Sequence, residues 1–462
     1  MNDITAIFDF LKYCLGSKGD MSRVIACMDW QMLYSFASKQ ALLGLCFEGI
    51  ERLGKEYPEE LKRNPIGREL LMTWMGKEQQ IRRQNMKVNA VASKLFSMLR
   101  EDGLRCCILK GQGNALMYPN PYSRTPGDID VWIDASRERI MEYTQKKFEL
   151  GDDIRLQHLE TSLDGVPVEL HFFPCSMNNS LYHARLQKWF RRNADLQCSH
   201  IVRLPDGIGE IAIPTTAFNV VYQLTHLYHH FFDEGIGMRQ IIDYFLVVND
   251  FSKNVFLNTD FSNHPVNFSN HPVPLSKEGS TFSPSPSSSG SGDVTAPSRC
   301  SEPLRSKVGG PSKVSPDCAG WDRRDAIGDI ASDASGSSAF TTDSSASTAL
   351  DVVQRELKYL GLWKFAGAVM FVLHEVLGLS EEKMIVPVDE KRGKLLLAEI
   401  LDGGNFGQHF TKYGHFTQQG MAKKYFLKIW RNMHFVRYYP AEALSEPIFR
   451  TWHFFWRVKN KK

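Results

Sequence analysis

Two aspartates stand one residue apart in GDIDVWID, residues 127–134, a segment that is otherwise mostly apolar and typical of a buried β-strand. Side chains at positions i and i+2 of a strand point to the same face, so the carboxylates of Asp128 and Asp130 should project together. Two such carboxylates repel each other and lose hydration when they are covered. A divalent cation is the simplest compensation, and hard oxygen ligands suit Mg²⁺, which usually arrives with substrate phosphates.

A glycine-containing turn precedes this strand in ILKGQGNAL, residues 108–116. A strand is expected to end at Lys110, and a helix to begin after the glycines Gly111 and Gly113. Glycines let the backbone approach an anion, and a helix N-terminus offers free N–H groups to phosphate. An ordinary turn between a strand and a helix explains the same residues equally well.

A predicted hairpin also brings two acidic side chains together. The dipeptide Asp164-Gly165 is a favoured two-residue turn between two strand-like runs. Counting back from this turn places Glu160 opposite Glu169 on one face of the hairpin, and a pair of histidines beside them. Opposed glutamates are unfavourable unless a cation or a hydrogen bond intervenes. A solvated face is the alternative for a lone hairpin, whereas one metal site could serve both this hairpin and the aspartate pair.

The elements around these residues indicate an α+β fold with a small mixed sheet. We predict a helical N-terminal region over residues 1–103, an α/β core over 104–210 and helices over 211–250. Residues 251–349 are rich in Ser, Pro and Gly, and we predict a disordered linker there because few apolar side chains offset the ordering entropy. A helical C-terminal region is expected over 350–462.

Composition narrows the class of protein. Hydrophobic residues make up 43% of the chain, and the formal net charge is +3, which does not by itself indicate a nucleic-acid partner. The nine cysteines form no CxxC pair, so neither a zinc site nor a disulfide framework is expected. No signal peptide and no apolar run of about 18 residues is evident, so we expect a cytoplasmic protein without a transmembrane segment. The aromatic, basic tail fits a packed helical end, with a membrane or nucleic-acid surface as the alternative.

Other polar residues on predicted helices have simpler explanations. His226, His229 and His230 share one helix at spacings that could bind a metal, but no HExxH pattern is present, so packing or acceptor contacts are favoured. Arg239 and Asp243 are expected to form an i, i+4 ion pair.

The segments ILKG, YPNPYSRTPGDIDVWID, VPVELHFF and LTHLYHHFFDEGIGMRQIIDYFLVV together resemble an uncharacterised nucleotidyltransferase family of the DNA polymerase beta-like superfamily. The resemblance covers roughly residues 20–250 and again the helical C-terminal part. It implies an enzyme that uses Mg²⁺ or Mn²⁺ to transfer a nucleoside monophosphate from a nucleoside triphosphate to an acceptor hydroxyl of a protein, a sugar or an RNA end. A catalytically degenerate member that binds a nucleotide or a partner is the alternative.

The resemblance also implies roles for individual residues. Asp128 and Asp130 would bind both metal ions, and Glu169 would hold the catalytic metal and help activate the acceptor hydroxyl. The superfamily's phosphate-contacting serine is absent here, so charge from Lys110 would take its place. The residues expected to hold the triphosphate are Lys110, Gly111, Gly113 and Arg124.

Overall fold

The structure is a computed structural model that describes residues 3–148, 155–256, 342–410 and 421–460. Most of the predicted linker therefore lies outside the described residues. Both of its ends are helical, because α11 (Met238–Phe256) and α12 (Thr342–Tyr359) extend into it.

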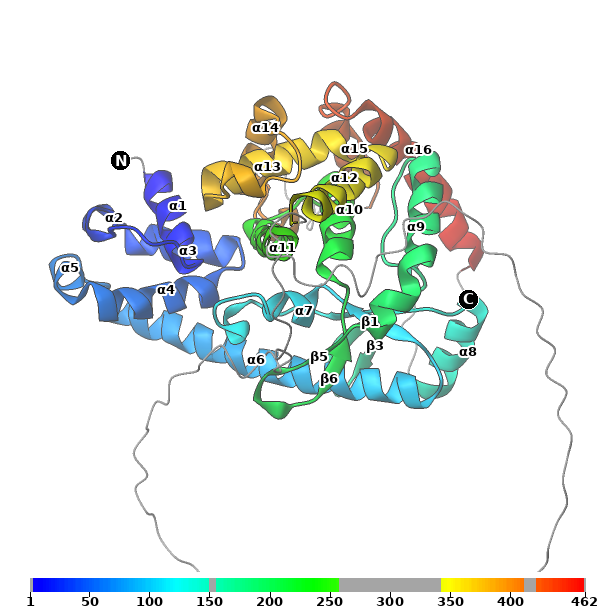
Figure 1. Cartoon of the computed structure of the whole chain (residues 1–462), viewed down its shortest axis with the longest axis horizontal. Helices are drawn as coiled ribbons and strands as arrows, with labels where there is room; N and C mark the ends of the chain where they lie inside the picture. The colour runs from blue at the N-terminus through cyan, green and yellow to red at the C-terminus, as the bar shows by residue number, and fades with distance from the viewer. Residues whose placement is uncertain (1–2, 149–154, 257–341, 411–420, 461–462) are drawn as a thin grey trace, which may run out of the picture. The chain divides into compact units, whose positions relative to one another are not determined.

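A four-stranded mixed sheet forms the centre of the α/β core, as predicted (Figure 1). Its strands lie in the order β1 (Cys106–Leu109), β2 (Ile129–Ile133), β4 (Val166–His171) and β3 (His158–Leu163). The two central strands, β2 and β4, are parallel, and both outer pairings are antiparallel. The predicted α+β class with a small mixed sheet is confirmed.

The hairpin of β3 and β4 has the predicted register. Asp164 and Gly165 have φ angles of 50° and 70°, as a two-residue hairpin turn with both central residues in the left-handed region requires. His158 pairs with His171, and Glu160 pairs with Glu169. The sequence-based pairing of both the histidines and the glutamates is therefore confirmed.

The two faces of the sheet pack against different helices. Ile129, Val131 and Ile133 belong to the apolar cluster that includes α6 (Arg68–Glu101), which passes alongside the sheet in Figure 1. Trp132 belongs instead to the main core and stacks on Phe218 of α10 (Thr216–Asp233), with ring centroids 6.2 Å apart. Since Asp130 shares the face of Trp132, the carboxylates project toward the α10 side.

The remaining helices build the two helical regions. The N-terminal region contains α1 (Asp3–Cys14), α2 (Ser22–Cys27), α3 (Trp30–Lys39), α4 (Leu43–Glu56) and α5 (Pro58–Arg63). The α/β core adds α7 (Gly111–Ala115), α8 (Arg137–Lys147), α9 (Ser180–Ser199) and a small ribbon of β5 (Ile201–Arg203) and β6 (Glu210–Ala212). The C-terminal region contains α12, α13 (Trp363–Leu377), α14 (Glu390–Gly403), α15 (Met421–Met433) and α16 (Pro440–Asn460).

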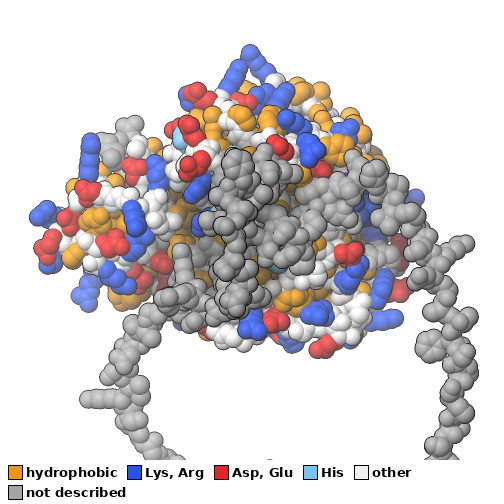
Figure 2. All heavy atoms as spheres, in the orientation of Figure 1, with side chains coloured by type: hydrophobic (Ala, Val, Ile, Leu, Met, Phe, Trp, Pro, Cys, Tyr) orange, Lys and Arg blue, Asp and Glu red, His pale blue; other side chains and the backbone are white. Residues whose placement is uncertain are grey.

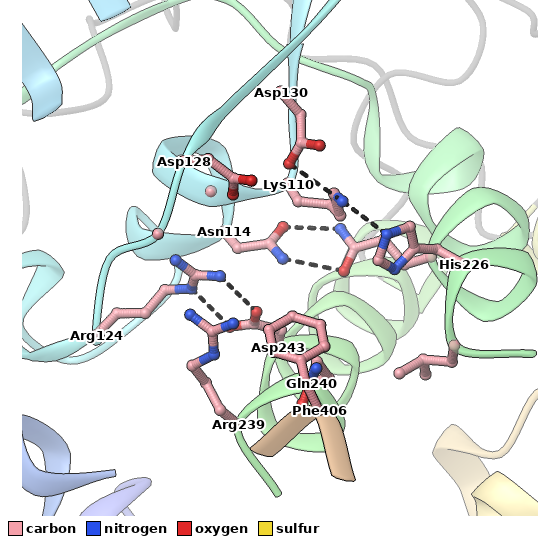
Figure 3. A pocket seen from close by; sticks show the side chains of 14 residues that line it. Lys110, Asn114, Arg124, Asp128, Asp130, His226, Arg239, Gln240, Asp243 and Phe406 are labelled. Atoms are coloured by element: carbon pink, nitrogen blue, oxygen red, sulfur yellow. Dashed lines mark hydrogen bonds and ion pairs between the residues drawn. The ribbon is translucent and has the colours of Figure 1, made fainter. Parts of the chain in front are cut away.

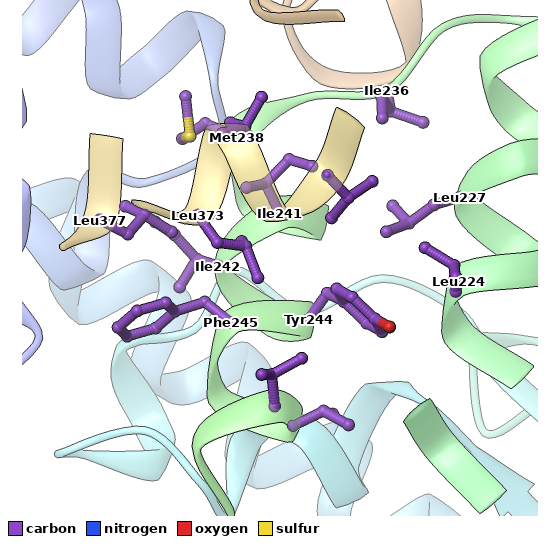
Figure 4. Packing of buried hydrophobic residues seen from close by; sticks show 14 of the residues in the cluster. Leu224, Leu227, Ile236, Met238, Ile241, Ile242, Tyr244, Phe245, Leu373 and Leu377 are labelled. Atoms are coloured by element: carbon purple, nitrogen blue, oxygen red, sulfur yellow. The ribbon is translucent and has the colours of Figure 1, made fainter. Parts of the chain in front are cut away.

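The main hydrophobic core contains residues of α10 and α11, which follow the sheet, and residues of the C-terminal region. Figure 4 shows Ile241 of α11 close to Leu373 of α13, and Leu224 of α10 belongs to the same apolar cluster, so residues on both sides of the predicted linker share one core. Within the described ranges, no helix is both long and apolar enough to cross a membrane.

The aromatic, basic tail is partly packed and partly exposed. Arg431 of α15 is buried and donates Nη1 to the carbonyl of Phe231 at 2.8 Å, which ties the tail to α10. Several aromatic side chains of α15 and α16 remain exposed, namely Phe426, Trp430, Trp452, Phe454 and Phe455. On the face drawn in Figure 2, Lys and Arg side chains are interspersed with Asp and Glu, so the described residues of this face present no large field of one sign.

Candidate active site

The parallel pairing of β2 with β4 places Asp130 directly beside Glu169. Asp128 stands just before β2 and lines the same pocket as Asp130, as Figure 3 shows. The charge of Glu169 acts on Asp128 as well, because it contributes to the raised pKa of that carboxyl. The three carboxylates singled out from the sequence are thus brought into one electrostatic cluster by the sheet.

Two nitrogen-bearing side chains offset the charge of Asp130. Lys110 Nζ lies 3.1 Å from Asp130 Oδ2, and His171 Nε2 lies 3.0 Å from Asp130 Oδ1. The same His171 nitrogen is 3.1 Å from Glu169 Oε2, so one imidazole bridges both strands. The sequence predicted a metal ion as the compensation, whereas the structure shows an ammonium group and an imidazole N–H.

The positive groups do not compensate all three carboxylates of the cluster. Burial favours the neutral form of Asp130, but Lys110 and His171 outweigh it and hold the pKa of Asp130 well below its usual range. His171 likewise lowers the pKa of Glu169 against the effect of burial. Within the described part of the chain no cationic side chain pairs with Asp128, and the charge of Asp130 together with burial raises its pKa to about 6. The cluster therefore carries one carboxylate more than its cations balance.

His171 is held in place by contacts on its far side. Gln157 Nε2 donates to the carbonyl of Pro174 at 3.1 Å and lies 3.2 Å from His171 Nδ1, while Ser176 Oγ donates to Gln157 Oε1. This amide presents an N–H to Nδ1 and favours a neutral ring, whereas the two carboxylates overcome burial and raise the pKa of His171 to about 9. In both protonation states Nε2 carries the hydrogen that holds Asp130 and Glu169 together.

A second group of donors could also hold a metal ion. Ligand atoms of His158, Glu169 and His171 all lie within 4.8 Å of one another. His158 is buried, neither of its ring nitrogens has a hydrogen-bond partner among the described residues, and burial lowers its pKa to about 4. Two imidazoles with one carboxylate suit borderline metal ions such as Zn²⁺, whereas the three carboxylates suit Mg²⁺ or Mn²⁺. His171 directs an N–H at Glu169, so this group would have to rearrange to bind a metal ion. Among the described residues, the carboxylate oxygens of Asp128, Asp130 and Glu169 do not all lie within the same 4.8 Å of one another.

The residues expected to hold a triphosphate separate into two groups. Lys110, Gly111 and Arg124 line the pocket with Asp128 and Asp130. Gly113 does not line it: a β-carbon there would approach the side chain of Ile213 to 3.1 Å, so this glycine permits close packing.

Lys110 joins the carboxylates to the histidine-rich helix α10. Its backbone has a φ of 49°, an unfavourable conformation for a residue with a β-carbon. Its Nζ lies 2.7 Å from His226 Nε2, and burial followed by the charge of Lys110 holds the pKa of His226 well below its usual range. A neutral His226 accepts from Lys110, which fixes the ammonium group at the pocket wall. The sequence favoured packing or acceptor contacts for His226, and the structure shows a specific contact with Lys110.

The expected pair between Arg239 and Asp243 is wrong. Asp243 instead accepts two hydrogen bonds from Arg124, at 2.9 and 2.8 Å, and one from the hydroxyl of Tyr118 at 2.8 Å. Arg239 donates Nη1 to the carbonyl of Thr125. A bidentate geometry with a distant arginine prevails over the neighbouring one, because both oxygens of the buried Asp243 are then satisfied.

Comparison with known proteins now identifies the family. A family model described as "uncharacterised nucleotidyltransferase" matches residues 26–260, just over half of the chain. The chain belongs to this nucleotidyltransferase family. No curated protein matches it. A crystal structure of an antigenic nucleotidyltransferase-like protein from Paracoccidioides brasiliensis is similar at 18% identity over 35% of this chain and 75% of that chain. Its TM-score of 0.25 is too low to support any inference.

Three residues in or beside this pocket were not among the expected catalytic, metal-binding or triphosphate-binding residues: His226 and Phe406 line it, and His171 contacts Asp130 and Glu169. His171 could be found from the hairpin register, which puts it on the face of Glu169. For His226, the sequence indicated only that it shares one helix with His229 and His230. Phe406 lines the pocket but lies far outside the matched residues 26–260, and no local pattern indicates its position.

Proposed function

We propose that this chain is a metal-dependent nucleotidyltransferase that transfers a nucleoside monophosphate from a nucleoside triphosphate to an acceptor hydroxyl and releases pyrophosphate. The observation that carries the proposal is the register of β2 and β4, which sets Asp130 beside Glu169 while Asp128 faces the same pocket. The excess negative charge of this cluster favours a divalent cation. Membership of a nucleotidyltransferase family supports the same reaction class.

Asp128, Asp130 and Glu169 would hold Mg²⁺ or Mn²⁺, and the bound metal would neutralise charge on the triphosphate and favour ionisation of the acceptor hydroxyl. Glu169 would accept the hydroxyl proton. His171 acts as a positioning residue, because its Nε2 hydrogen fixes the relative placement of two carboxylates.

The triphosphate would lie at the wall formed by Lys110 and Gly111. The ammonium group of Lys110 stands at the pocket and is oriented by His226, so it can contact a phosphate oxygen. Arg124 would shape that wall rather than donate to the triphosphate, since two of its nitrogens pair with Asp243. The acceptor would be a hydroxyl of a protein, a sugar or an RNA end.

A binding module without turnover is the second candidate. It is favoured by one observation: Lys110 and His171 already occupy both oxygens of Asp130. A catalytically degenerate member of the family would keep this closed arrangement and bind a nucleotide or a partner without transferring it.

Label transfer separates the two candidates. The purified chain is incubated with each α-³²P-labelled nucleoside triphosphate and Mg²⁺ or Mn²⁺, alone and with a cell extract as the source of acceptor, and labelled products are separated on a denaturing gel. Asp128→Asn is the test variant. Asp134→Asn is the matched control, because Asp134 follows the same strand but pairs with Arg105 away from the pocket.

The proposal expects label transfer by the wild-type chain and by Asp134→Asn, and none by Asp128→Asn. Equal labelling by Asp128→Asn and the wild type would contradict it. Nucleotide binding without any transfer would favour the binding module.

A further inference from the structure

An aromatic residue from the C-terminal region lines the pocket of the carboxylate cluster. In Figure 3, Phe406 lies near Arg239 and Gln240, on the opposite side of the view from Asp128 and Asp130. We propose that Phe406, Arg239 and Gln240 form a subsite for the nucleobase of the nucleoside triphosphate. This inference rests on the proposed function, and it adds the residues that would contact the nucleobase.

The backbone holds Phe406 in a conformation that its side chain disfavours. Its φ is 52°, and the left-handed region is unfavourable for a bulky residue. The turn around it is wedged in place: a β-carbon at Gly407 would overlap the carbonyl oxygen of Glu234, and one at Gly237 would lie 2.7 Å from the Cα of Asn405. The surrounding packing therefore fixes the ring at the pocket despite the local cost.

Two buried side chains beside the ring each carry a nitrogen that has no hydrogen-bond partner among the described residues. Arg239 and Gln240 are each 8% exposed. Arg239 Nη1 donates to Thr125, but its Nε has no hydrogen-bond partner among the described residues. Gln240 Oε1 accepts from the N–H of Gly237 at 2.8 Å, whereas its Nε2 has none in the same part of the chain. A buried donor left unpaired is unfavourable, so both groups favour a ligand that brings acceptors.

The combination of ring and donors selects the class of ligand. The Arg239 guanidinium carbon is 5.6 Å from the centroid of the Phe406 ring, so the cation and the aromatic surface belong to one subsite. Asp243 offers no free acceptor there, because Arg124 and Tyr118 engage it. A phosphate would satisfy Arg239 but would leave the strained ring unexplained. A planar heterocycle with acceptor atoms on its edge stacks on the ring and accepts from both donors.

Titration calorimetry with two ligands tests the subsite. The purified full chain is titrated with guanosine triphosphate and, separately, with inorganic tripolyphosphate, both with Mg²⁺. Tripolyphosphate reports the phosphate and metal contacts alone, so the difference between the two ligands reports the nucleoside. Guanosine triphosphate is chosen because the O6 and N7 atoms of guanine are adjacent acceptors.

Phe406→Gly is the informative variant, because glycine removes the ring and adopts a positive φ freely. We expect affinity for guanosine triphosphate to fall roughly tenfold or more, affinity for tripolyphosphate to stay within about twofold, and thermal stability to be kept or raised. Phe406→Tyr retains a stacking ring and is expected to keep most of the affinity for guanosine triphosphate.

Equal losses for both ligands in Phe406→Gly, or no loss for either, would overturn the subsite. If the wild-type chain binds both ligands with equal affinity, the subsite fails while the proposed function stands. If the wild-type chain binds neither ligand, both proposals fail.

Discussion

Two buried charge clusters each contribute residues to one pocket, and they are compensated in different ways. Arg124 and Asp243 form a bidentate pair, and Tyr118 adds a third hydrogen bond to the carboxylate. Arg124 outweighs the effect of burial and lowers the pKa of Asp243. Near them, three carboxylates face one lysine and one histidine, and the pKa of Asp128 is raised to about 6. The first cluster is balanced, whereas the second has spare negative charge.

The difference indicates what each cluster does. A balanced pair with satisfied oxygens has no capacity for a ligand, so the Arg124–Asp243 pair joins the loop before β2 to α11 and shapes the pocket. An unbalanced cluster at the same pocket is costly for the protein alone and becomes favourable when a cation enters. Such a local cost is typical of functional sites.

Breaking the balanced pair should have the largest effect on stability. Arg124→Met leaves Asp243 buried without its partner, and we expect the free energy of unfolding to fall by about 3–5 kcal/mol in urea titrations. The double variant Arg124→Met/Asp243→Leu should recover much of that loss, because no isolated charge remains. A single variant as stable as the wild type would show that the pair is not structural.

Asp130→Asn should destabilise the protein in metal-free buffer by about 1–3 kcal/mol, because Lys110 and His171 lose their shared partner. From the sequence alone, asparagine at either aspartate is expected to relieve repulsion and to keep or raise stability. The structure restricts that expectation to Asp128. Chemical unfolding of Asp130→Asn beside the wild type measures the effect, and a gain in stability would contradict the pairing with Lys110.

Asp128→Asn should instead stabilise the metal-free protein by about 1–3 kcal/mol near pH 7.5, because it removes a carboxylate whose pKa is raised to about 6. A folded-state pKa above the usual carboxylate value means that the wild type loses stability as pH rises through about 6. The advantage of the variant should therefore shrink as the pH falls toward 4. Unfolding titrations at both pH values measure this, and an advantage that grows in acid would refute the assignment.

The smallest effect is expected at an exposed ion pair. Lys94 and Asp164 lie 2.7 Å apart at the hairpin turn, with side chains 56% and 50% exposed. Asp164→Asn keeps a residue that favours the left-handed turn and removes the ion pair, so unfolding should change by less than about 0.5 kcal/mol. A thermal melt measures the change. A loss of stability comparable to that of Arg124→Met would mean that burial does not determine how much each ion pair contributes to stability.

The sequence predicts the parts of this site that follow from local geometry. The turn Asp164-Gly165 sets the hairpin register, and strand periodicity places Asp128 and Asp130 on one face. Partners that approach through tertiary packing carry no local signal. The pairing of Arg124 with Asp243 was missed because the neighbouring Arg239 looked sufficient, and Phe406 comes from a region joined to the pocket only by the fold.

The most direct test of the central claim is Mn²⁺ binding measured by electron paramagnetic resonance, which reports free Mn²⁺ as protein is added. The wild type, Asp128→Asn and the control Asp134→Asn are compared in the presence of a nucleoside triphosphate, after subtraction of the Mn²⁺ bound by the nucleotide alone. We expect the wild type and Asp134→Asn to bind Mn²⁺ equally, and Asp128→Asn to bind it at least about tenfold more weakly, a difference of about 1.4 kcal/mol. Equal Mn²⁺ affinity in all three proteins would contradict the assignment of the carboxylate cluster as a metal site.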